Sequence, residues 1–337
     1  MKIGRFDIAR RPLLIAEIGN NHEGDPTQAR ALVDAALDCG VDAVKVQVID
    51  PVRLVNISQK ERIAQLSRFS LSAETMAEMA ARTKRGGALF MASAFDAGSL
   101  SRIAPHCDAI KVASGDLDFQ PLVASVARLG KPIVLSTGMA TLDEIRAAVN
   151  VVKSSLPSGD ALEDRLALLH CVSLYPTQPA QANLLAIRTL AETFSLTTGY
   201  SDHTLGIEIA LIALGMGARI IEKHFTLDKR RATFRDHALS ADPADMRQLA
   251  TAVRSFAEIL GDGEKGDRIA DRAMAGIARR SIVAGRDLAA GTRLRAEDLD
   301  FVRPGDGIPS SKLAEVVGKT LNKPLGHHAL LGWKDLG

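Results

Sequence analysis

Two histidines lie near the ends of neighbouring apolar runs, His203 in one run and His224 in the next. In a closed sheet of parallel strands, the carboxyl ends of all strands meet at one face, so both imidazoles are expected there. Two neutral imidazoles suit a first-row divalent ion and leave positions open for water and a substrate oxygen. No third protein ligand is clear, so the alternative of two hydrogen-bonded core histidines stays open. Asp202 and Glu222 are candidates for orienting the rings, although Glu222 equally suits a structural role.

Polar groups that suit an anion occur at the ends of the other apolar runs. Lys45 and Lys111 would point into a largely dry barrel, which is costly unless they meet an anion. They therefore predict a substrate that carries phosphate, carboxylate or both. Hydroxyl donors around the same anion are expected from Ser93, Ser114, Ser136 and Ser201. Taken singly, a serine has turn or cap chemistry as its alternative, and a lysine has a salt bridge to a barrel carboxylate.

Further polar residues suit proton transfer and sugar binding. Glu17 is a candidate general base or water activator, and an ion pair with Lys45 is its equal alternative. Asp236 and His237 are candidates for contacts with sugar hydroxyls. The same strand ends also deliver Gln47, Asp116, Ser173 and Tyr175.

The elements that must position these residues form a repeating pattern of short apolar runs and longer amphipathic ones. This alternation is typical of βα units around a buried parallel sheet. Eight runs read as strands and predict a closed (β/α)8 TIM barrel. They are Leu13–Gly19, Asp42–Val48, Ala88–Phe95, Ala109–Gly115, Pro132–Met139, Leu166–Tyr175, Leu196–His203 and Arg219–Thr226.

Helix signals between these runs support the barrel. Asp25-Pro26 supplies an N-cap and a first-turn proline, and Gly40 stands where the helix should stop. Thr141 and Glu144 have the spacing of a capping box. A second helix is predicted over Ser72–Arg85. The polar segment Ile49–Phe69 before it is predicted to be an active-site loop.

The pattern changes after Gly261. Residues 262–278 begin with a polar, glycine-rich stretch that predicts a linker between a catalytic domain at 1–261 and a small domain at 279–337. The small domain has short β-like pieces, such as Ser281–Ala284, and turns such as Arg303–Gly307. The overall prediction is an α/β protein with a TIM barrel followed by a small β-rich domain.

Composition excludes several classes of protein. The net charge of +2 is spread along the chain and aromatic residues make up only 4%, which disfavours a nucleic-acid surface. The longest apolar stretch, near 207–217, is too short and glycine-interrupted to span a bilayer, and no signal peptide is visible at the N-terminus. Cys39, Cys107 and Cys171 are widely separated and odd in number. No disulfide framework is expected, which favours a reducing cytoplasm.

The chain resembles the sialic acid (N-acetylneuraminate) synthases through a series of ordered motifs. They are Ala16-Glu17-Ile18-Gly19-Asn20-Asn21-His22-Glu23-Gly24, Lys111-Val112-Ala113-Ser114-Gly115-Asp116, Leu135-Ser136-Thr137-Gly138-Met139, His170-Cys171-Val172-Ser173-Leu174-Tyr175-Pro176-Thr177, Tyr200-Ser201-Asp202-His203-Thr204 and Glu222-Lys223-His224-Phe225-Thr226. Residues 279–337 resemble the antifreeze-like SAF domain (a β-clip) of those enzymes. The resemblance covers nearly the whole chain, and six ordered motifs are far more specific than any one of them.

The resemblance implies condensation of phosphoenolpyruvate with the open-chain aldehyde of an N-acylated amino sugar, which releases phosphate and gives a nonulosonic acid. His203 and His224 would bind Mn²⁺, with Mg²⁺ or Co²⁺ as alternatives, and the ion would hold the aldehyde oxygen. Glu17 would assist proton transfer or the water that attacks C2. Phosphoenolpyruvate would be held by Lys45, Ser93, Lys111, Ser114, Ser136, Ser173 and Ser201. The residues facing the sugar would be Gln47, Asp116, Tyr175 and Asp236.

The resemblance also implies a domain-swapped homodimer, in which the SAF domain of one subunit caps the barrel of its partner and Arg303 reaches the sugar's acyl group. Departures from the family pattern fall on the sugar side, at Val46, at Ile49–Phe69 and at 232–235. Within Ile49–Phe69, Asn56 is the candidate counterpart of an asparagine that contacts the sugar in the family. The acceptor therefore stays open between N-acetylmannosamine and a 2,4-diacetamido hexose, the precursor of legionaminic or pseudaminic acid. A Schiff-base aldolase using Lys111 or Lys45 and a non-catalytic sugar-binding protein are the rival classes.

Overall fold

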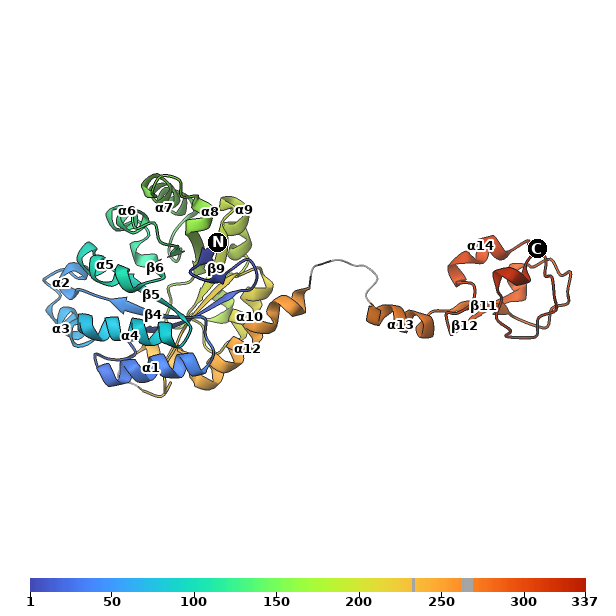
Figure 1. The fold of residues 1–337 in the computed structure, drawn as a ribbon, viewed down its shortest axis with the longest axis horizontal. Helices are drawn as coiled ribbons and strands as arrows, with labels where there is room; N and C mark the ends of the chain where they lie inside the picture. The colour runs from blue at the N-terminus through green and yellow to red at the C-terminus, as the bar shows by residue number, and fades with distance from the viewer. Residues whose placement is uncertain (232–233, 262, 264–268) are drawn as a thin grey trace. The chain divides into compact units, whose positions relative to one another are not determined.

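The computed structural model describes residues 1–231, 234–261, 263 and 269–337 (Figure 1). Contacts between residues divide the chain into two compact units, Met1–Gly261 and Asp262–Gly337. The two units have separate hydrophobic cores, and each is described here by itself. Among the described residues, no helix combines the length and the apolar character needed to cross a membrane.

Eight parallel strands close into a barrel in the first unit, in the order β10-β3-β4-β5-β6-β7-β8-β9. The strands are β3 (Leu13–Gly19), β4 (Ala43–Val48), β5 (Leu89–Ala94), β6 (Ala109–Val112), β7 (Ile133–Ser136), β8 (Leu166–Cys171), β9 (Thr197–Asp202) and β10 (Ile220–His224). Each strand coincides with one predicted run, and the predicted TIM-barrel fold is confirmed. Several predicted runs extend too far at the carboxyl end. The run predicted to Gly115, for example, ends at Val112 because Ser114–Asp116 form a 3-10 turn.

The barrel interior is apolar at one end and polar at the other. A two-stranded hairpin, β1 (Lys2–Ile3) and β2 (Phe6–Asp7), adds Ile3 to the apolar end. Side chains alternate across a strand, so Leu13, Ile15 and Glu17 of β3 all face the interior. Leu13 and Ile15 belong to the apolar cluster, and Glu17 lies beyond it. The alternation therefore carries each strand from an apolar floor to a polar layer at its carboxyl end.

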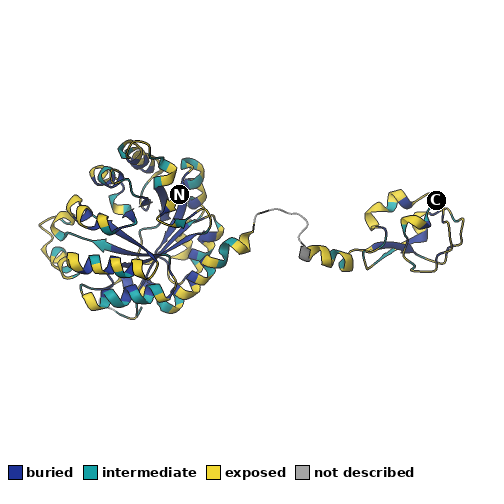
Figure 2. Ribbon diagram, viewed as in Figure 1, coloured by how far each residue is buried: buried dark blue, intermediate teal, exposed yellow. Residues whose placement is uncertain are grey.

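Helices cover the outside of the barrel, with exposed residues on their outer faces and buried strands inside (Figure 2). The main helix of each βα unit is, in order, α1 (Pro26–Asp38), α4 (Ala73–Arg85), α5 (Ala97–Ile103), α6 (Gln120–Ala127), α7 (Leu142–Ser155), α9 (Ala186–Phe194), α10 (Glu208–Gly215) and α12 (Pro243–Leu260). The short helices α8 (Leu162–Arg165) and α11 (Asp236–Leu239) precede β8 and α12. The predicted caps are confirmed. Asp25 accepts a hydrogen bond from the amide of Thr27, and Thr141 forms a capping box with Glu144. Gly40, just past α1, has the expected positive φ of 79°.

The prediction of a loop over Ile49–Phe69 is wrong, because this segment forms α2 (Pro51–Leu54) and α3 (Lys60–Arg68). Asp50 caps α2 by accepting a hydrogen bond from the amide of Val52, with a proline in the first turn. This is the same signal as the one before α1. The α3 helix is mostly polar and buries only Leu66, so the sequence pattern of a polar loop hid it.

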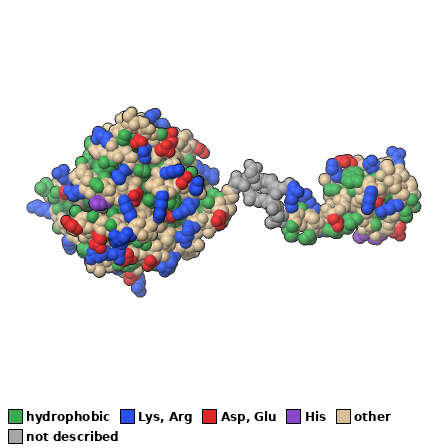
Figure 3. Space-filling model, in the orientation of Figure 1, with side chains coloured by type: hydrophobic (Ala, Val, Ile, Leu, Met, Phe, Trp, Pro, Cys, Tyr) green, Lys and Arg blue, Asp and Glu red, His purple; other side chains and the backbone are tan. Residues whose placement is uncertain are grey.

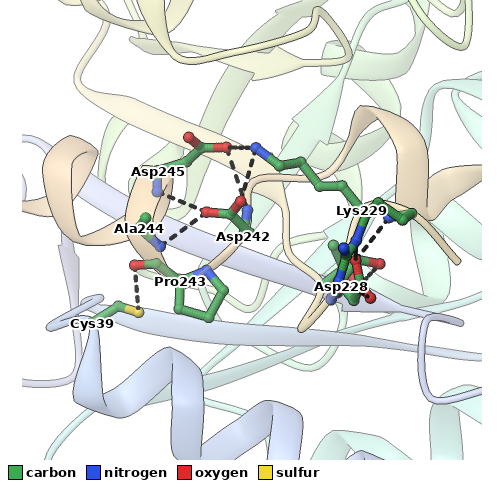
Figure 4. A network of polar contacts seen from close by, with 9 residues as sticks. Cys39, Asp228, Lys229, Asp242, Pro243, Ala244 and Asp245 are labelled. Atoms are coloured by element: carbon green, nitrogen blue, oxygen red, sulfur yellow. Dashed lines mark hydrogen bonds and ion pairs between the residues drawn. The ribbon is translucent and has the colours of Figure 1, made fainter.

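Ion pairs tie the segment after β10 to the start of α12 (Figure 4). Lys229 Nζ lies 2.9 Å from Asp242 and 2.6 Å from Asp245. Asp242 in turn caps α12 by accepting hydrogen bonds from the amides of Ala244 and Asp245. Lys229 therefore stabilises local structure through its two carboxylate partners.

The surface of this unit mixes basic and acidic side chains on the face shown in Figure 3.

The second unit is small and rich in extended segments. Its elements are α13 (Ile269–Ala278), β11 (Ser281–Ala284), β12 (Leu299–Val302) and α14 (Leu313–Val316). The two strands pair antiparallel, and isolated bridges such as Val283 with Leu330 extend the pairing. The predicted linker at 262–278 is helical over its last ten residues, Ile269–Ala278. Four alanines in this stretch, good helix formers, explain the difference.

Candidate active site

A cavity of about 210 Å³ lies at the carboxyl ends of the barrel strands. Most residues predicted for the site lie in its wall, where side-chain alternation on the eight strands brings them together. These are Glu17, Lys45, Gln47, Ser93, Lys111, Ser114, Ser136, Ser173, Tyr175, Ser201, His203 and His224. Other wall residues were not among the predicted ligands, and they include Met139, Cys171 and Glu222.

Lys45 lies between two buried carboxylates. Its Nζ is 2.9 Å from Glu17 Oε2 and 3.5 Å from Glu222 Oε2. The ion pair given as the alternative for Glu17 is therefore present. Gln47 donates to the other Glu17 oxygen at 2.9 Å, and Ser201 donates to Glu222 at 2.9 Å. This network fixes the orientation of both carboxylates within the cavity.

The two carboxyls of this network differ in pKa. Burial raises the pKa of Glu17, and Lys45 and Gln47 only partly offset the rise. Burial also raises the pKa of Glu222, but the charges of Lys111 and Lys45 outweigh it and the net pKa is lowered. Burial lowers the pKa of Lys45, and its two carboxylate neighbours reverse that effect. The two carboxyls share Lys45, so their titrations are linked, and the raised pKa of Glu17 makes it the candidate for proton transfer.

Lys111 has a different environment from Lys45. Its Nζ donates to the carbonyl oxygen of Val112 at 2.9 Å, and burial lowers its pKa. Among the described residues it forms no ion pair, so its charge is directed at the cavity. A buried ammonium group without a carboxylate partner is suited to an anionic ligand.

Serine hydroxyls and a glycine amide surround the same part of the cavity. Gly138 N donates to Ser114 Oγ at 3.0 Å. A Cβ built on Gly138 would lie 2.5 Å from Ser173 Oγ and 2.9 Å from Ser114 Oγ, so only glycine fits between the two hydroxyls. Ser136 Oγ is buried and has no hydrogen-bond partner among the described residues. This hydroxyl is therefore available to hydrogen-bond a ligand oxygen in the cavity that Lys111 also lines.

The two histidines face each other across the cavity. Their ring centroids are 5.4 Å apart, and the Tyr175 ring lies 4.1 Å from the ring of His203. His203 Nδ1 lies 2.9 Å from the carbonyl oxygen of Val172. A carbonyl only accepts, so Nδ1 carries the proton and Nε2 keeps its lone pair, the arrangement usual for a metal-binding histidine.

The residues of the cavity fit a divalent ion held by two protein ligands. His224 Nδ1 is buried without a hydrogen-bond partner among the described residues. Burial and the nearby charges of His203 and Lys45 lower the pKa of His224, which keeps the ring neutral as metal binding requires. No group of three or more His, Cys, Asp or Glu side chains suited to a metal occurs in the described part of the chain. The remaining positions of such an ion would belong to water and substrate.

Cys171 is a cavity residue that sequence reasoning used only to judge the redox compartment. Its Sγ lies 3.7 Å from His203 Nδ1. Burial raises the pKa of the thiol, but His203 and Lys111 together lower it below its ordinary value. Burial lowers the pKa of His203, and its contacts with Cys171 and with the Val172 carbonyl raise it overall. The alternation of β8, with Leu169 in the apolar interior cluster, was the signal that placed Cys171 in the cavity.

The expectation that Asp202 orients a histidine ring by direct contact is wrong. Asp202 is fully buried and pairs with Lys223 at 2.8 Å, on the strand face opposite to Ser201. Glu222, the second candidate for that role, lies in the cavity, where its oxygens meet Lys45 and Ser201. The physical reason is strand alternation, which places Asp202 and Glu222 on opposite faces of the barrel wall.

Several predicted residues lie outside the cavity wall. His237 is fully buried, with its ring nitrogens 2.7 Å from Thr226 Oγ1 and 3.1 Å from Glu23 Oε1, so the predicted contact with a sugar hydroxyl is wrong. Asp116 is partly buried in the turn after β6, and burial, opposed by Lys111, raises its pKa to about 6. Asp236 is buried, and burial raises its pKa although Arg235 lies 3.3 Å away. Arg303 is exposed and belongs to the second unit. Arg235, a cation in the 232–235 segment that departs from the family pattern, lies over the Tyr175 ring at 5.1 Å. Residues 232–233 of the same segment lie outside the described residues.

Comparisons with known proteins agree with this geometry. The profile of the NeuB family matches residues 32–265, and that of the SAF domain matches residues 279–337. The N,N'-diacetyllegionaminic acid synthase of Legionella pneumophila is 38% identical over 96% of this chain and 94% of its own. The N-acetylneuraminate-9-phosphate synthase of Drosophila melanogaster is 31% identical over 93% of this chain and 92% of its own.

A solved structure shares the barrel. The N-acetylneuraminic acid synthetase of Leptospira borgpetersenii, crystallised with citrate, has a TM-score of 0.75 and 31% identity, covering 81% of this chain and 94% of that one. The resemblance seen in the sequence motifs is thus confirmed at the level of family and fold. The chain belongs to the NeuB family of enzymes and carries a C-terminal SAF domain.

Proposed function

We propose that this enzyme condenses phosphoenolpyruvate with the open-chain aldehyde of an N-acylated amino sugar to give a nonulosonic acid and phosphate. One observation carries the proposal: two buried lysines and two facing histidines line the same cavity. The lysines suit an enol phosphate, and the histidines suit an ion that would hold an aldehyde oxygen. Two relatives with names of nonulosonic acid synthases support the choice.

The anion half of the cavity would orient phosphoenolpyruvate. Lys111, whose charge no carboxylate neutralises directly, would pair with its phosphate or carboxylate, and the hydroxyls of Ser114 and Ser136 would donate to other oxygens. The new bond forms between C3 and the aldehyde carbon; water then adds at C2, and the C2–O bond breaks to release phosphate. Fixed cationic groups stabilise the charge that shifts towards the leaving phosphate.

Proton transfer would fall to Glu17. Its raised pKa allows it to hold a proton, and Lys45 at 2.9 Å and Gln47 at 2.9 Å fix its two oxygens. In that position it would donate a proton to the developing alkoxide or accept one from the attacking water. A bound Mn²⁺, with Mg²⁺ or Co²⁺ as alternatives, would supply Lewis-acid polarisation of the aldehyde, with His203 and His224 as its protein ligands.

The acceptor is the least constrained part of the proposal. An N-acetylmannosamine-type sugar and a 2,4-diacetamido hexose both fit the chemistry. The name of the Legionella relative, which is 38% identical, favours the diacetamido sugar over the phosphorylated acceptor suggested by the name of the 31% identical Drosophila relative. Asp236, Tyr175 and Arg235 would distinguish these sugars, and their mutual contacts support treating them as one group: Arg235 lies 3.3 Å from Asp236 and 5.1 Å from the centre of the Tyr175 ring.

We further propose a domain-swapped homodimer in which the SAF domain of one subunit caps the barrel of its partner and Arg303 contacts the acyl group. The support is the family resemblance of residues 279–337 and the exposure of Arg303. A cytoplasmic location is proposed because all three cysteines are free and buried.

Phosphate release with a panel of acceptors tests the proposed function. The purified enzyme, with phosphoenolpyruvate and Mn²⁺, is expected to release phosphate with one of N-acetylmannosamine, its 6-phosphate or a 2,4-diacetamido hexose. Chelation of the metal should stop the reaction, and re-addition of Mn²⁺ should restore it. Activity that persists in chelator would contradict the metal-dependent reaction.

The aldolase rival has its own test, because the lowered pKa of Lys111 also suits a Schiff base. Borohydride added with pyruvate would trap a covalent adduct on a lysine only in that case. A non-catalytic sugar-binding protein would instead bind the acceptor without phosphate release, and would keep that affinity after His203→Ala or His224→Ala.

A further inference from the structure

Asp202 and Lys223 form an ion pair on the outer face of the barrel wall, away from the cavity. Lys223 Nζ lies 2.8 Å from Asp202 Oδ2, and both side chains are fully buried. The two residues are directly opposite each other in the register of β9 and β10. Their sequence neighbours, Ser201, His203, Glu222 and His224, all line the cavity. The pair thus lies immediately behind the two histidines.

The pair also anchors the segment that follows His203. Lys223 Nζ donates to the carbonyl oxygen of Thr204 at 2.5 Å. Thr204 donates from both its amide and its hydroxyl to Asp202 Oδ1, each at 2.8 Å. The amide of Thr177 donates to the carbonyl oxygen of His203 at 2.9 Å, which connects this segment to the loop of Tyr175. Three hydrogen bonds between the ion pair and Thr204, together with the bond from Thr177 to His203, therefore hold the backbone around His203.

At these strand ends, residue type does not distinguish the inner face from the outer one, and only continuity with the apolar start of β10 does so. The sequences Ser201-Asp202-His203 and Glu222-Lys223-His224 are polar on both faces of the wall. A slip of one residue would turn His224 outward and Lys223 inward, because the side-chain period of a strand is two. Elsewhere in the barrel an apolar inner layer specifies register, as Ile220 does at the start of β10. At the carboxyl end another interaction has to maintain that register.

We propose that the Asp202–Lys223 pair is a positioning element: it fixes the register of β9 against β10 and so holds His203 and His224 at the separation that binds the ion. The inference rests on the proposed function, since it assigns these histidines to a metal. A buried ion pair replaced by apolar residues of similar volume often leaves stability unchanged or improved, whereas register specification is its best-attested use. The pair is accordingly expected to matter more for geometry than for stability.

The test is the double substitution Asp202→Leu with Lys223→Met in the full-length enzyme. We expect a cooperative thermal transition close to that of the parent. We also expect at least tenfold weaker Mn²⁺ binding, measured by electron paramagnetic resonance without substrate, as for other residues that orient metal ligands. A milder variant, Thr204→Val, removes one hydrogen bond to Asp202 and should weaken Mn²⁺ binding less.

A matched control is the ion pair of Arg11 and Asp42, which joins the starts of β3 and β4 at the opposite end of the barrel with contacts of 2.9 and 2.6 Å. Arg11→Met with Asp42→Leu should leave Mn²⁺ affinity unchanged. Parent-like Mn²⁺ affinity in the Asp202→Leu, Lys223→Met variant would overturn the proposal. Failure of that variant to fold would also overturn it, because the pair would then be a stability element.

A second readout does not depend on metal. Deuterium exchange followed by mass spectrometry should be faster in the double variant for peptides containing the amides of Thr177 and Phe225, which donate to His203 and Glu17. Exchange should be unchanged at the Leu13 amide, which donates to Arg219 at the other end of the barrel. If the parent enzyme binds no Mn²⁺, the proposal of a Mn²⁺ site is refuted. The exchange rates alone then decide whether the Asp202–Lys223 pair fixes the register of β9 and β10. Unchanged exchange at Thr177 and Phe225 would refute it.

Discussion

The two buried lysines of the cavity differ in their partners, and this difference gives them opposite effects on stability. Lys45 is neutralised by Glu17 and Glu222. Lys111 has only a backbone carbonyl as a hydrogen-bond partner among the described residues, and burial lowers its pKa. A site that keeps an unpaired buried charge sacrifices stability for binding.

Substitutions of the two lysines should therefore change stability in opposite directions. Lys111→Met removes a poorly compensated charge and is expected to stabilise the protein by on the order of 1 kcal/mol while abolishing phosphoenolpyruvate binding. Lys45→Met leaves two buried carboxylates without their cation and is expected to cost about 3–5 kcal/mol. Urea denaturation and calorimetric titration with phosphoenolpyruvate measure the two effects. A loss of stability in Lys111→Met would show that Lys111 is a structural residue.

Asp116 gives a pH-dependent prediction. Burial raises its pKa from 3.8 to about 6, so its ionised form is disfavoured in the folded state. Below pH 3.8 the carboxyl is protonated in both states, so its raised pKa does not lower the free energy of unfolding. The destabilisation grows as the pH rises from 3.8 and is complete above about pH 6. Asp116→Asn should therefore raise the melting temperature by a few degrees at pH 7, on the order of 1 kcal/mol, and hardly at all at pH 4. A constant difference between pH 4 and pH 7 would contradict the shifted pKa.

Most of the cavity residues were predictable from the sequence because they follow apolar runs at strand ends. It was harder to predict which residues inside the motifs face the cavity, because Glu222, Lys223 and His224 are all polar. Counting by twos from Ile220, a residue of the apolar interior, places Glu222 and His224 inside and Lys223 outside. The roles of Glu222, Asp202 and Cys171 therefore depend on a register that local patterning alone does not fix.

At the level of elements, the segment with α2 and α3 contacts the loop of the proposed sugar-binding residues without lining the active-site cavity. Gly24, in the loop after β3, has φ of 82°, and a Cβ there would lie 1.9 Å from the carbonyl oxygen of Arg68 at the end of α3. The adjacent Phe69 packs edge-on against Phe234, with centroids 5.0 Å apart. Phe234 precedes Arg235 and Asp236, so a shift of α3 would reach the proposed sugar contacts.

Gly24→Ala is expected to displace α3 and to cost about 2 kcal/mol or more, since both the backbone conformation and the contact are unfavourable for alanine. The Michaelis constant of the acceptor should rise more than that of phosphoenolpyruvate, because the displaced contacts lie on the acceptor side. Gly215→Ala in α10 is the control, as a Cβ there meets nothing within 4 Å, and it should be neutral or stabilising. Equal stability of the two variants would exclude a close approach of α3 to Gly24.

The strands were predictable as elements because buried parallel strands are continuous apolar runs. The longer capped helices were predictable from Asp25-Pro26 and Thr141 with Glu144. The α2 and α3 helices were not, since short polar helices are held by tertiary contacts more than by their own periodicity. In the predicted linker, the glycines before α13 obscured the alanine-rich sequence that follows.

At the level of the whole molecule, the two units have separate cores, and Arg303 lies on the surface of the second. The barrel unit contains both lysines and both histidines of the cavity. The proposed domain-swapped dimer would complete each site with an arginine from the partner subunit. Each site would then need an intact barrel from one chain and an intact small domain from the other.

Mixing two defective variants tests this arrangement. Lys111→Met is expected to abolish phosphoenolpyruvate binding in the cavity of the barrel. Arg303→Ala is expected to weaken acceptor binding more than phosphoenolpyruvate binding. Co-expression in equal amounts would make half of the dimers mixed, and one of the two sites in each mixed dimer would combine two intact parts. Activity should therefore recover to about a quarter of the parent value at low acceptor concentration. If Arg303 served the barrel of its own chain, the mixed dimers would show no recovery above the sum of the two variants.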